Sequence, residues 1–279
     1  MKKKRVASWN WDELSNSQFL PWSVELIDRY IDKWNWTWLS GNKSLPWSIE
    51  FIDRYKDKWN WVSLIWNENL RSVELIEKYE DKWNWNILSL LQWLPWSIEF
   101  IEKYENKWNW EELSRKSLSW PIEFIEKHKD KWNWEELSGN HTLPWSVELI
   151  EKYIDKWDWE RLSWNGALPW SIEFIDKYID KWDWKGLSWN TSLPWSVELI
   201  DRYIDKWDWQ ELSCNEALSW SVDFFEKHID KWDWERLSRK SLPWSIELID
   251  RYKDKWNWKE LSRKSLPWSI ELIDKYKGE

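Results

Sequence analysis

The sequence predicts an all-α solenoid, on the strength of a fixed repeat length, two helix patterns in each repeat and an abundance of tryptophan. The motif Trp-x-Trp, with Asn or Asp in the middle, recurs eleven times at steps of 24 or 25 residues. A fixed period of this length is typical of stacked repeats, because one such unit cannot bury its apolar face alone. Of the 279 residues, 37 are Trp. Since each Trp side chain can bury about 150–250 Å², tryptophan explains how so short a unit can hold together.

The repeats fill the chain from residue 9 to residue 279. The first Trp of each motif is Trp9, Trp34, Trp59, Trp83, Trp108, Trp132, Trp157, Trp182, Trp207, Trp232 or Trp256. No linker or low-complexity segment interrupts them. We therefore expect a short basic lead over residues 1–8 and a single tandem-repeat domain over residues 9–279.

Each repeat contains a pattern typical of a longer helix. In the repeat that begins at Trp182, Ser196 is a good N-cap residue, and Glu198 falls in the first turn, where it suits the helix dipole. An apolar stripe at helical spacing runs from Val197 to Trp207. The pattern predicts a helix of about three turns, with an ion pair between Glu198 and Arg202, which are four residues apart.

A shorter helix is expected around the Trp-x-Trp motif. Asp208 can cap a helix that begins at Trp209, and Asn133 and Asn257 occupy the same place in other repeats. A strand is the alternative, since a leucine-rich repeat places a strand at similar spacing. Charged pairs such as Glu160-Arg161 disrupt the apolar alternation that a strand requires, so we favour one or two turns of α or 3₁₀ helix.

Composition excludes several classes of protein. A single cysteine, Cys214, rules out an internal disulfide framework and a multi-cysteine metal site. No apolar run reaches the length of a membrane span, and no apolar segment follows the basic start as a secretory signal would require. We expect an acidic protein of the cytoplasm or another intracellular compartment, with no membrane association and no cofactor.

The repeat resembles the tryptophan-rich short tandem repeats of giant viruses and uncharacterised bacterial proteins. The matching positions are Asn190, Trp195, Glu198, Ile200, Trp207, Asp208 and Trp209. The Pro that follows Asn in that family is absent here, and Lys206 stands where the family often has Pro. The layout is also similar to the leucine-rich repeat variant, whose α and 3₁₀ helices alternate. Over residues 8 to 279 these resemblances imply an α-solenoid, and they carry over no catalytic residues.

No set of residues indicates catalysis or metal binding. His128 and His228 occupy a position that is Tyr in nine other repeats, so we interpret them as packing residues. Cys214 replaces a Trp found in the neighbouring repeats and has no base near it in the sequence. The serines after Trp recur in nearly every repeat and are interpreted as helix caps. Enzyme activity is not expected.

Nucleic acid and glycan binding are less favoured than protein binding. The chain has a net charge of -9, and its basic pairs Arg115-Lys116, Arg239-Lys240 and Arg263-Lys264 all lie in repeats of 24 residues. Those pairs are interpreted as shortened loops, since single-strand binding needs a basic track. Exposed Trp could bind glycans, but most Trp residues have the spacing of core positions.

Variation among the repeats suggests a partner-binding surface. In repeats two to four the short helix and the loop after it become apolar, and the residues concerned are Trp38, Val62, Ile65, Trp66, Ile87, Leu90, Leu91 and Trp93. Local repacking is one interpretation, because the third repeat also lacks the Pro-Trp step. The other is a binding patch for a protein partner, since contiguous exposed apolar surface marks interfaces.

Three hypotheses of function follow. The first is a non-enzymatic scaffold or protein-binding module that uses the variable short-helix and loop face. The second is self-assembly, in which apolar ends of the solenoid join head to tail as a homo-oligomer, in rods or fibres. The third is glycan binding by exposed Trp.

Overall fold

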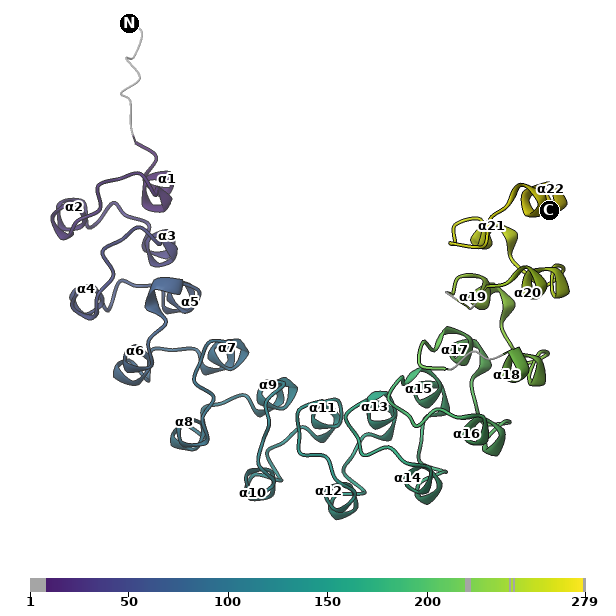
Figure 1. Ribbon diagram of the computed structural model, residues 1–279. Coiled ribbons are helices and arrows are strands. Elements are labelled where there is room, and N and C mark those ends of the chain that lie inside the picture. The colour runs from purple at the N-terminus through teal and green to yellow at the C-terminus, as the bar shows by residue number, and fades with distance from the viewer. Residues whose placement is uncertain (1–8, 219–221, 241, 243, 278–279) are drawn as a thin grey trace, which may run out of the picture. The chain divides into compact units, whose positions relative to one another are not determined.

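All regular secondary structure is helical over the residues that the computed structural model describes, 9–218, 222–240, 242 and 244–277 (Figure 1). This confirms the predicted all-α solenoid, and the strand alternative is wrong for the described ranges. The chain divides into two compact units, Met1–Leu113 and Ser114–Glu279. Residues 1–8, the predicted basic lead, lie outside the described part.

Two kinds of helix alternate along the chain. The odd-numbered helices begin at the second Trp of the Trp-x-Trp motif: α1 (Trp11–Asn16), α3 (Trp36–Gly41), α5 (Trp61–Ile65), α7 (Trp85–Leu90), α9 (Trp110–Arg115), α11 (Trp134–Ser138), α13 (Trp159–Trp164), α15 (Trp184–Trp189), α17 (Trp209–Cys214), α19 (Trp234–Ser238) and α21 (Trp258–Leu261). The even-numbered helices begin at Val or Ile: α2 (Val24–Arg29), α4 (Ile49–Arg54), α6 (Val73–Lys78), α8 (Ile98–Lys103), α10 (Ile122–Lys127), α12 (Val147–Lys152), α14 (Ile172–Lys177), α16 (Val197–Arg202), α18 (Val222–Lys227), α20 (Ile246–Arg251) and α22 (Ile270–Tyr276). A 3₁₀ turn, η1 (Glu68–Leu70), follows α5.

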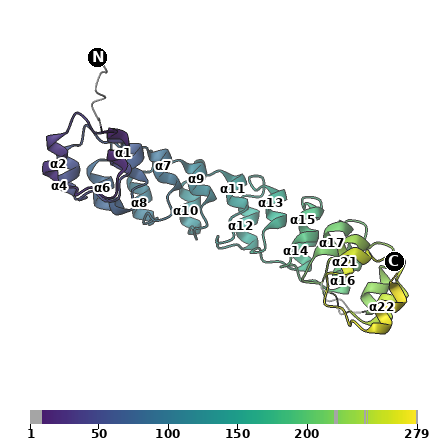
Figure 2. The same cartoon turned by 90° about the horizontal axis from the view of Figure 1, so that it is seen from above.

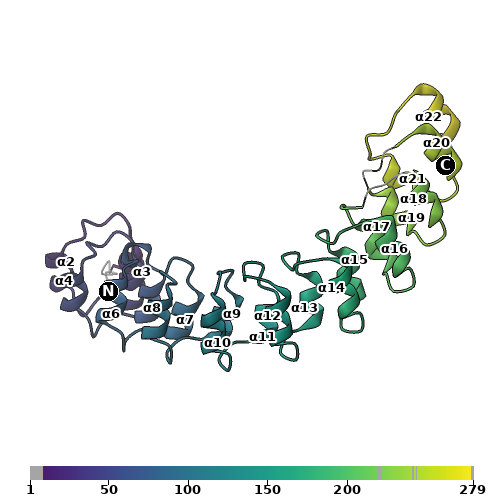
Figure 3. The same cartoon turned by 60° about the horizontal axis from the view of Figure 1, so that its bottom comes forward.

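Each unit contains two parallel rows of helices. In the first unit, α1, α3, α5 and α7 contact one another in order, and α2, α4, α6 and α8 form the second row (Figures 1 and 2). In the second unit the contacts run from α11 to α21 through successive odd-numbered helices, with the even-numbered helices beside them (Figure 3). We call these the odd row and the even row. Leu39, Phe51 and Ile52 illustrate the buried core between the rows.

The predicted helix starts are confirmed at both kinds of helix. The hydroxyl of Ser196 accepts a hydrogen bond from the backbone N–H of Leu199 at 3.1 Å. The carboxylate of Asp208 accepts one from the N–H of Glu211 at 3.0 Å. Asn133 and Asn257 cap α11 and α21 in the same way. Each cap satisfies a donor that the first helical turn leaves without a partner.

The predicted length of the longer helix is wrong. Helix α16 has six residues and ends at Arg202, because the next residue, Tyr203, has a φ of -123° and leaves the helical region. A tight turn follows the helix, in which the N–H of Trp207 donates to the carbonyl of Tyr203 at 3.3 Å. This turn keeps apolar residues at nearly helical spacing, so the apolar stripe in the sequence extends beyond the helix. The expected pair of Glu198 with Arg202 is also replaced, because Arg202 binds Asp176 of the preceding repeat.

Tryptophan makes such short helices possible in two ways. The indole N–H of Trp207 donates to the carbonyl of Ile200 at 3.1 Å, inside the helix that precedes it. The indole of Trp209 donates to Ile204, and that of Trp195 donates to Asn190. A helix of six residues leaves most of its C-terminal carbonyls without helical partners. The rings therefore fill the core while their N–H groups satisfy the backbone of turns and helix ends.

Candidate functional site

Four of the eight predicted partner-binding residues are exposed in the odd row of the first unit. They are Trp38 on α3, Val62 on α5, Trp66 at the end of α5 and Leu90 at the end of α7, with exposed fractions of 46–58%. The three helices are neighbours in the row (Figure 1). The structure thus brings these four side chains to consecutive helices of one row, and we call them the α3–α7 apolar surface.

The other four residues do not belong fully to this surface. Ile65 and Leu91 are buried, so the expectation that they line an exposed patch is wrong. Ile65 takes a position at which most other repeats have a buried Ser, and Leu91 takes one at which they have a buried Asn. Ile87 and Trp93 are half-buried. The burial of Ile65 and Leu91 agrees with the local repacking that the sequence offers as one interpretation, while the binding patch stays a prediction for the exposed residues.

The position of Trp66 in its repeat explains its exposure. It is the C-cap residue of α5, and the same position ends α13 at Trp164 and α15 at Trp189. All three indoles are exposed, and the rings of Trp164 and Trp189 lie 6.5 Å apart between centroids. The two Trp residues of the second unit were missed as surface residues. Their repeat position, shared with Trp66, is the signal that could have found them.

Elsewhere in the odd row, charged pairs take the positions that are apolar in the first unit. Arg161 of α13 binds Glu136 of α11 at 3.1 Å and Glu135 at 2.8 Å. Arg236 of α19 binds Glu211 of α17 at 3.3 Å. In each pair, a positive charge of one repeat is neutralised by a negative charge of the preceding repeat. Exposed charge in this row is therefore local pairing, in contrast to the α3–α7 apolar surface.

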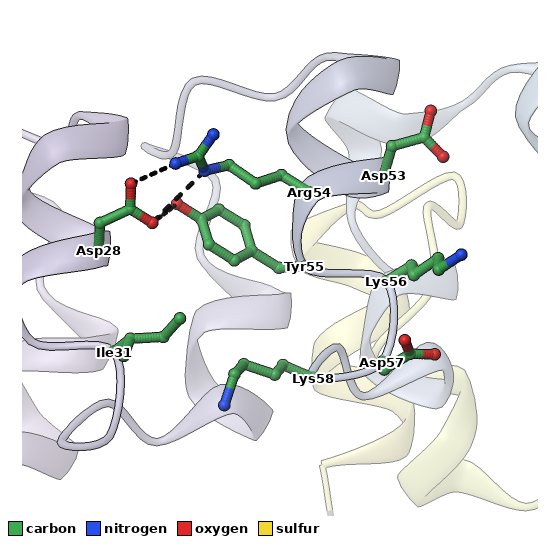
Figure 4. Close-up of a pocket in the computed structure, with 8 residues that line it drawn as sticks. All are labelled: Asp28, Ile31, Asp53, Arg54, Tyr55, Lys56, Asp57 and Lys58. Atoms are coloured by element: carbon green, nitrogen blue, oxygen red, sulfur yellow. Dashed lines mark hydrogen bonds and ion pairs between the residues drawn. The ribbon is translucent and has the colours of Figure 1, made fainter.

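A second candidate is a cavity of about 430 Å³ in the even row, lined by the eight residues drawn in Figure 4. Asp28 of α2 points toward Arg54 and Tyr55, whereas Asp53 points away from this group (Figure 4). The carboxylate of Asp28 accepts hydrogen bonds from Arg54 at 2.6 Å and from the Tyr55 hydroxyl at 2.7 Å. Asp53 accepts from Lys78 and Tyr79 of the next repeat.

The electrostatics of this cavity are those of a structural ion pair. The hydrogen bond from Arg54, followed by that from Tyr55, lowers the pKa of the Asp28 carboxyl. Burial, reinforced by Asp28, raises the pKa of Tyr55 to about 12. At neutral pH the carboxylate is charged and the phenol is neutral, so neither group is poised to exchange a proton.

This carboxylate arrangement recurs along the even row. Asp176 accepts from Arg202 and Tyr203, and Asp250 accepts from Lys275 and Tyr276. An acid that binds a cation and a tyrosine of the next repeat recurs along the row. It holds successive repeats together and does not mark one particular site. Among the described residues no three His, Cys, Asp or Glu side chains are grouped as a metal site would require.

The two histidines take the place of tyrosine, as the sequence predicts. His128 and His228 are both buried at the end of their helices. Nε2 of His228 lies 3.1 Å from the carboxylate of Asp201, which is the acid of the preceding repeat. Burial lowers the pKa of His228, and Asp201 opposes this effect. The residue thus keeps the geometry of the tyrosine position.

The basic pairs and the cysteine are also built into the repeats. Arg115 lies 3.3 Å from Glu136, Arg239 lies 2.6 Å from Glu235, and Arg263 lies 3.1 Å from Glu260. Lys240 donates to the backbone carbonyl of Asn215. Sγ of Cys214 lies 3.3 Å from the guanidinium of Arg236.

Comparison with known proteins gives no relative for this chain. No family model matches it, and no curated protein or solved structure is significantly similar to it. What the described residues define is an all-α tandem-repeat architecture with tryptophan-rich packing. None of the described helices combines the length and the apolar character that crossing a membrane requires.

Proposed function

We propose that the chain is a non-enzymatic protein-binding scaffold and that the α3–α7 apolar surface is where the partner binds. The observation that carries this proposal is the exposure of Trp38, Val62, Trp66 and Leu90 on three neighbouring helices. Single exposed apolar residues are common on proteins, whereas groups of them mark interaction sites. Aromatic residues are enriched and charged residues depleted at the centres of protein interfaces.

The chemistry of this surface favours a protein over a glycan. Val62 and Leu90 have no polar side-chain atoms, so they offer no hydrogen bonds to sugar hydroxyls. Both are nearly half exposed, and they lie on helices next to those that carry Trp38 and Trp66. A mixed aliphatic and aromatic surface complements an apolar segment of another protein. At such interfaces a few residues, often Trp, contribute most of the binding energy.

Hydrogen bonds and ring contacts hold the α3 part of this surface to the next repeat before a partner binds. Helix α3 is joined to the next repeat by hydrogen bonds: the N–H of Asn60 donates to the Ser40 hydroxyl at 2.9 Å, and the side-chain amide of Asn67 donates to the Ser40 carbonyl at 3.3 Å. Ring contacts such as Trp36 with Trp59, at 4.9 Å between centroids, fix the helices from beneath. A preorganised surface loses little conformational freedom on binding.

The test uses the full chain, immobilised as the wild type and as the variant Trp66→Ser with Leu90→Ser. Proteins captured from a lysate are identified by mass spectrometry, and each candidate is purified and titrated by calorimetry. The double variant should bind the purified partner at least about tenfold more weakly, as expected when a central Trp is removed. Circular dichroism should show unchanged helicity, because both side chains are exposed.

Trp189→Ser is the matched control, since Trp189 ends α15 at the same repeat position and is also exposed, at 46% against 58% for Trp66. It should keep wild-type affinity for the partner. Equal binding by the wild type, the double variant and the control would contradict the proposal. Retention on a glycan array that the double variant abolishes would instead support the sugar-binding hypothesis.

A further inference from the structure

The even row repeats one contact between successive helices, and α2 with α4 illustrates it. Ile27 on α2 is completely buried, and Asp28 beside it binds Arg54 and Tyr55 of the next repeat. Tyr55 is itself buried. One repeat therefore contributes an Ile and an acid to each contact, and the next contributes a cation and a tyrosine.

The surface around α1 and α2 carries the cation and the tyrosine of this contact, and no Ile and acid from a preceding repeat cover them in the described part of the chain. Tyr30 is exposed, whereas its counterpart Tyr55 is buried. Arg29 binds only Glu25 of its own helix among the pairs that the structure shows, at 2.7 Å. Trp9 is 75% exposed, although the first Trp of later repeats is buried. Together with Leu26, Trp9 and Tyr30 line a cavity of about 270 Å³.

The surface around α21 and α22 carries the Ile and the acid of this contact, and no cation and tyrosine from a following repeat cover them in the described part of the chain. Ile273 is 54% exposed, while its counterpart Ile249 is completely buried. Asp274 is the acid of this repeat, and its carboxylate lies 3.7 Å from the ammonium of Lys277, the residue that follows α22. Trp268 is exposed as well. Ser262 is exposed, although the same serine is buried in other repeats.

The interior repeats show how these two surfaces fit each other. Trp256 packs against Trp234 at 4.7 Å and Trp244 at 5.1 Å between ring centroids. Trp258 and Trp268 stand in the corresponding positions of the last repeat, and Trp9 is the counterpart of Trp256. The hydroxyl of Ser238 accepts from the N–H of Asn257 at 2.9 Å. Ser262 and Asn10 hold the corresponding places on the two surfaces.

We infer that a second copy of this chain docks head to tail, with the α1–α2 surface of one copy against the α21–α22 surface of the other. Ile273 covers Leu26 and Tyr30 of the next copy, and Asp274 binds its Arg29, as Asp28 binds Arg54. Trp9 enters between Trp258 and Trp268. Because the two surfaces differ, a dimer keeps one free copy of each, and association continues beyond the dimer.

The test measures the mass of the full chain by sedimentation velocity and light scattering over a hundredfold range of concentration. The wild type should form dimers and longer oligomers as concentration rises. Ile273→Glu should remain monomeric at every concentration, because a charge would enter the apolar contact. Ile270→Glu is the matched control and should assemble like the wild type, since Ile270 and its interior counterpart Ile246 are both exposed.

A mixing experiment tests the polarity of the contact. Ile273→Glu keeps an intact α1–α2 surface, and Trp9→Glu keeps an intact α21–α22 surface. Each variant alone should be monomeric, and an equimolar mixture should form dimers and nothing larger. A constant monomer mass for the wild type, equal effects of Ile273→Glu and Ile270→Glu, or a mixture that stays monomeric would overturn the inference. Trp66→Ser, which alters only the proposed partner surface, should assemble like the wild type.

Discussion

The hydroxyl of Ser163 joins two consecutive repeats through the backbone N–H of Asp183. Its oxygen accepts from that N–H at 2.9 Å while its proton is donated to the carbonyl of Trp159 at 2.7 Å. The side chain is completely buried. The same bond to the next repeat is made by Ser15, Ser40, Ser89, Ser114, Ser138, Ser188, Ser213 and Ser238. A buried serine therefore joins the odd helix of one repeat to the start of the next.

Ser163→Ala should destabilise the protein by about 1–3 kcal/mol, because it leaves the partly buried N–H of Asp183 without its acceptor. Chemical denaturation followed by circular dichroism measures this change. Ser262→Ala is the control, since Ser262 is exposed and bonds only to Trp258 of its own helix among the bonds that the structure shows. It should cost less than about 0.5 kcal/mol. Equal losses for both variants would show that the bond between repeats contributes nothing.

The sequence was sufficient for the repeat, the helical class and the helix starts, because these depend on local patterns. Ser196 and Asp208 have the residue type and spacing of N-caps, and both act as caps. The ends of the helices were not predictable in the same way. The indole of Trp207 satisfies a carbonyl seven residues back, and Ser163 reaches a residue twenty positions ahead. Contacts of this kind depend on how the chain turns after the helix ends.

The candidate surface was predictable only in part for a related reason. Trp66 and Ile65 are adjacent and both apolar, yet one is exposed and the other is buried. Which of two neighbours faces outward depends on the helix phase relative to the next repeat. Comparison of repeat positions resolves this, because the position of Ile65 is a buried Ser elsewhere and that of Trp66 varies freely.

Gly186→Ala should destabilise the protein although alanine favours helix formation. A Cβ at this position would lie 2.8 Å from Nε1 of Trp164, 2.9 Å from the carboxylate of Asp183 and 3.0 Å from Cβ of Ser163. We expect a loss of about 1–3 kcal/mol from this overpacking, measured as a lower denaturation midpoint. The reason is the close approach of α13 and α15, which are direct neighbours in the odd row.

Gly41→Ala is the matched control, since Gly41 ends α3 and a Cβ there would meet nothing within 4 Å. Gly41→Ala should be neutral or stabilise the protein by up to about 1 kcal/mol. If Gly186→Ala is also neutral or stabilising, the spacing between α13 and α15 adapts to the added methyl group and the overpacking argument is wrong.

His228→Tyr should raise stability and alter its dependence on pH. The tyrosine hydroxyl can donate to Asp201, as Tyr203 donates to Asp176, which is worth about 0.5–1.5 kcal/mol. Besides Asp201 of α16, the groups that face His228 include Lys227, Lys231 and the rings of Trp209 and Phe224.

The pH dependence follows from the lowered pKa of His228. Burial favours the neutral ring, so below the ordinary histidine pKa of 6.5 the unfolded chain binds more protons than the folded one. The wild type should therefore lose stability as pH falls through 6.5 and below, and His228→Tyr should lose less. Thermal denaturation at pH 5 and pH 7.5 measures the difference. If the difference in melting temperature between the wild type and His228→Tyr is no larger at pH 5 than at pH 7.5, His228 is not the cause of the pH dependence.

Lys240→Gln should stabilise the protein at pH 7 and lose this advantage in alkali. Burial lowers the pKa of Lys240 to about 8, although its ammonium donates to the carbonyl of Asn215. Between pH 8 and 10.5 the unfolded chain binds more protons than the folded chain, so the contribution of Lys240 to stability rises with pH. The glutamine amide removes the charge and keeps a donor, and we expect a gain of about 1–2 kcal/mol at pH 7 after allowing for partial solvent exposure. Denaturation midpoints at pH 7 and pH 10 give the comparison, with Lys259→Gln as an exposed control for the loss of one positive charge. A gain that is the same at both pH values would mean that desolvation of Lys240 is not its cause.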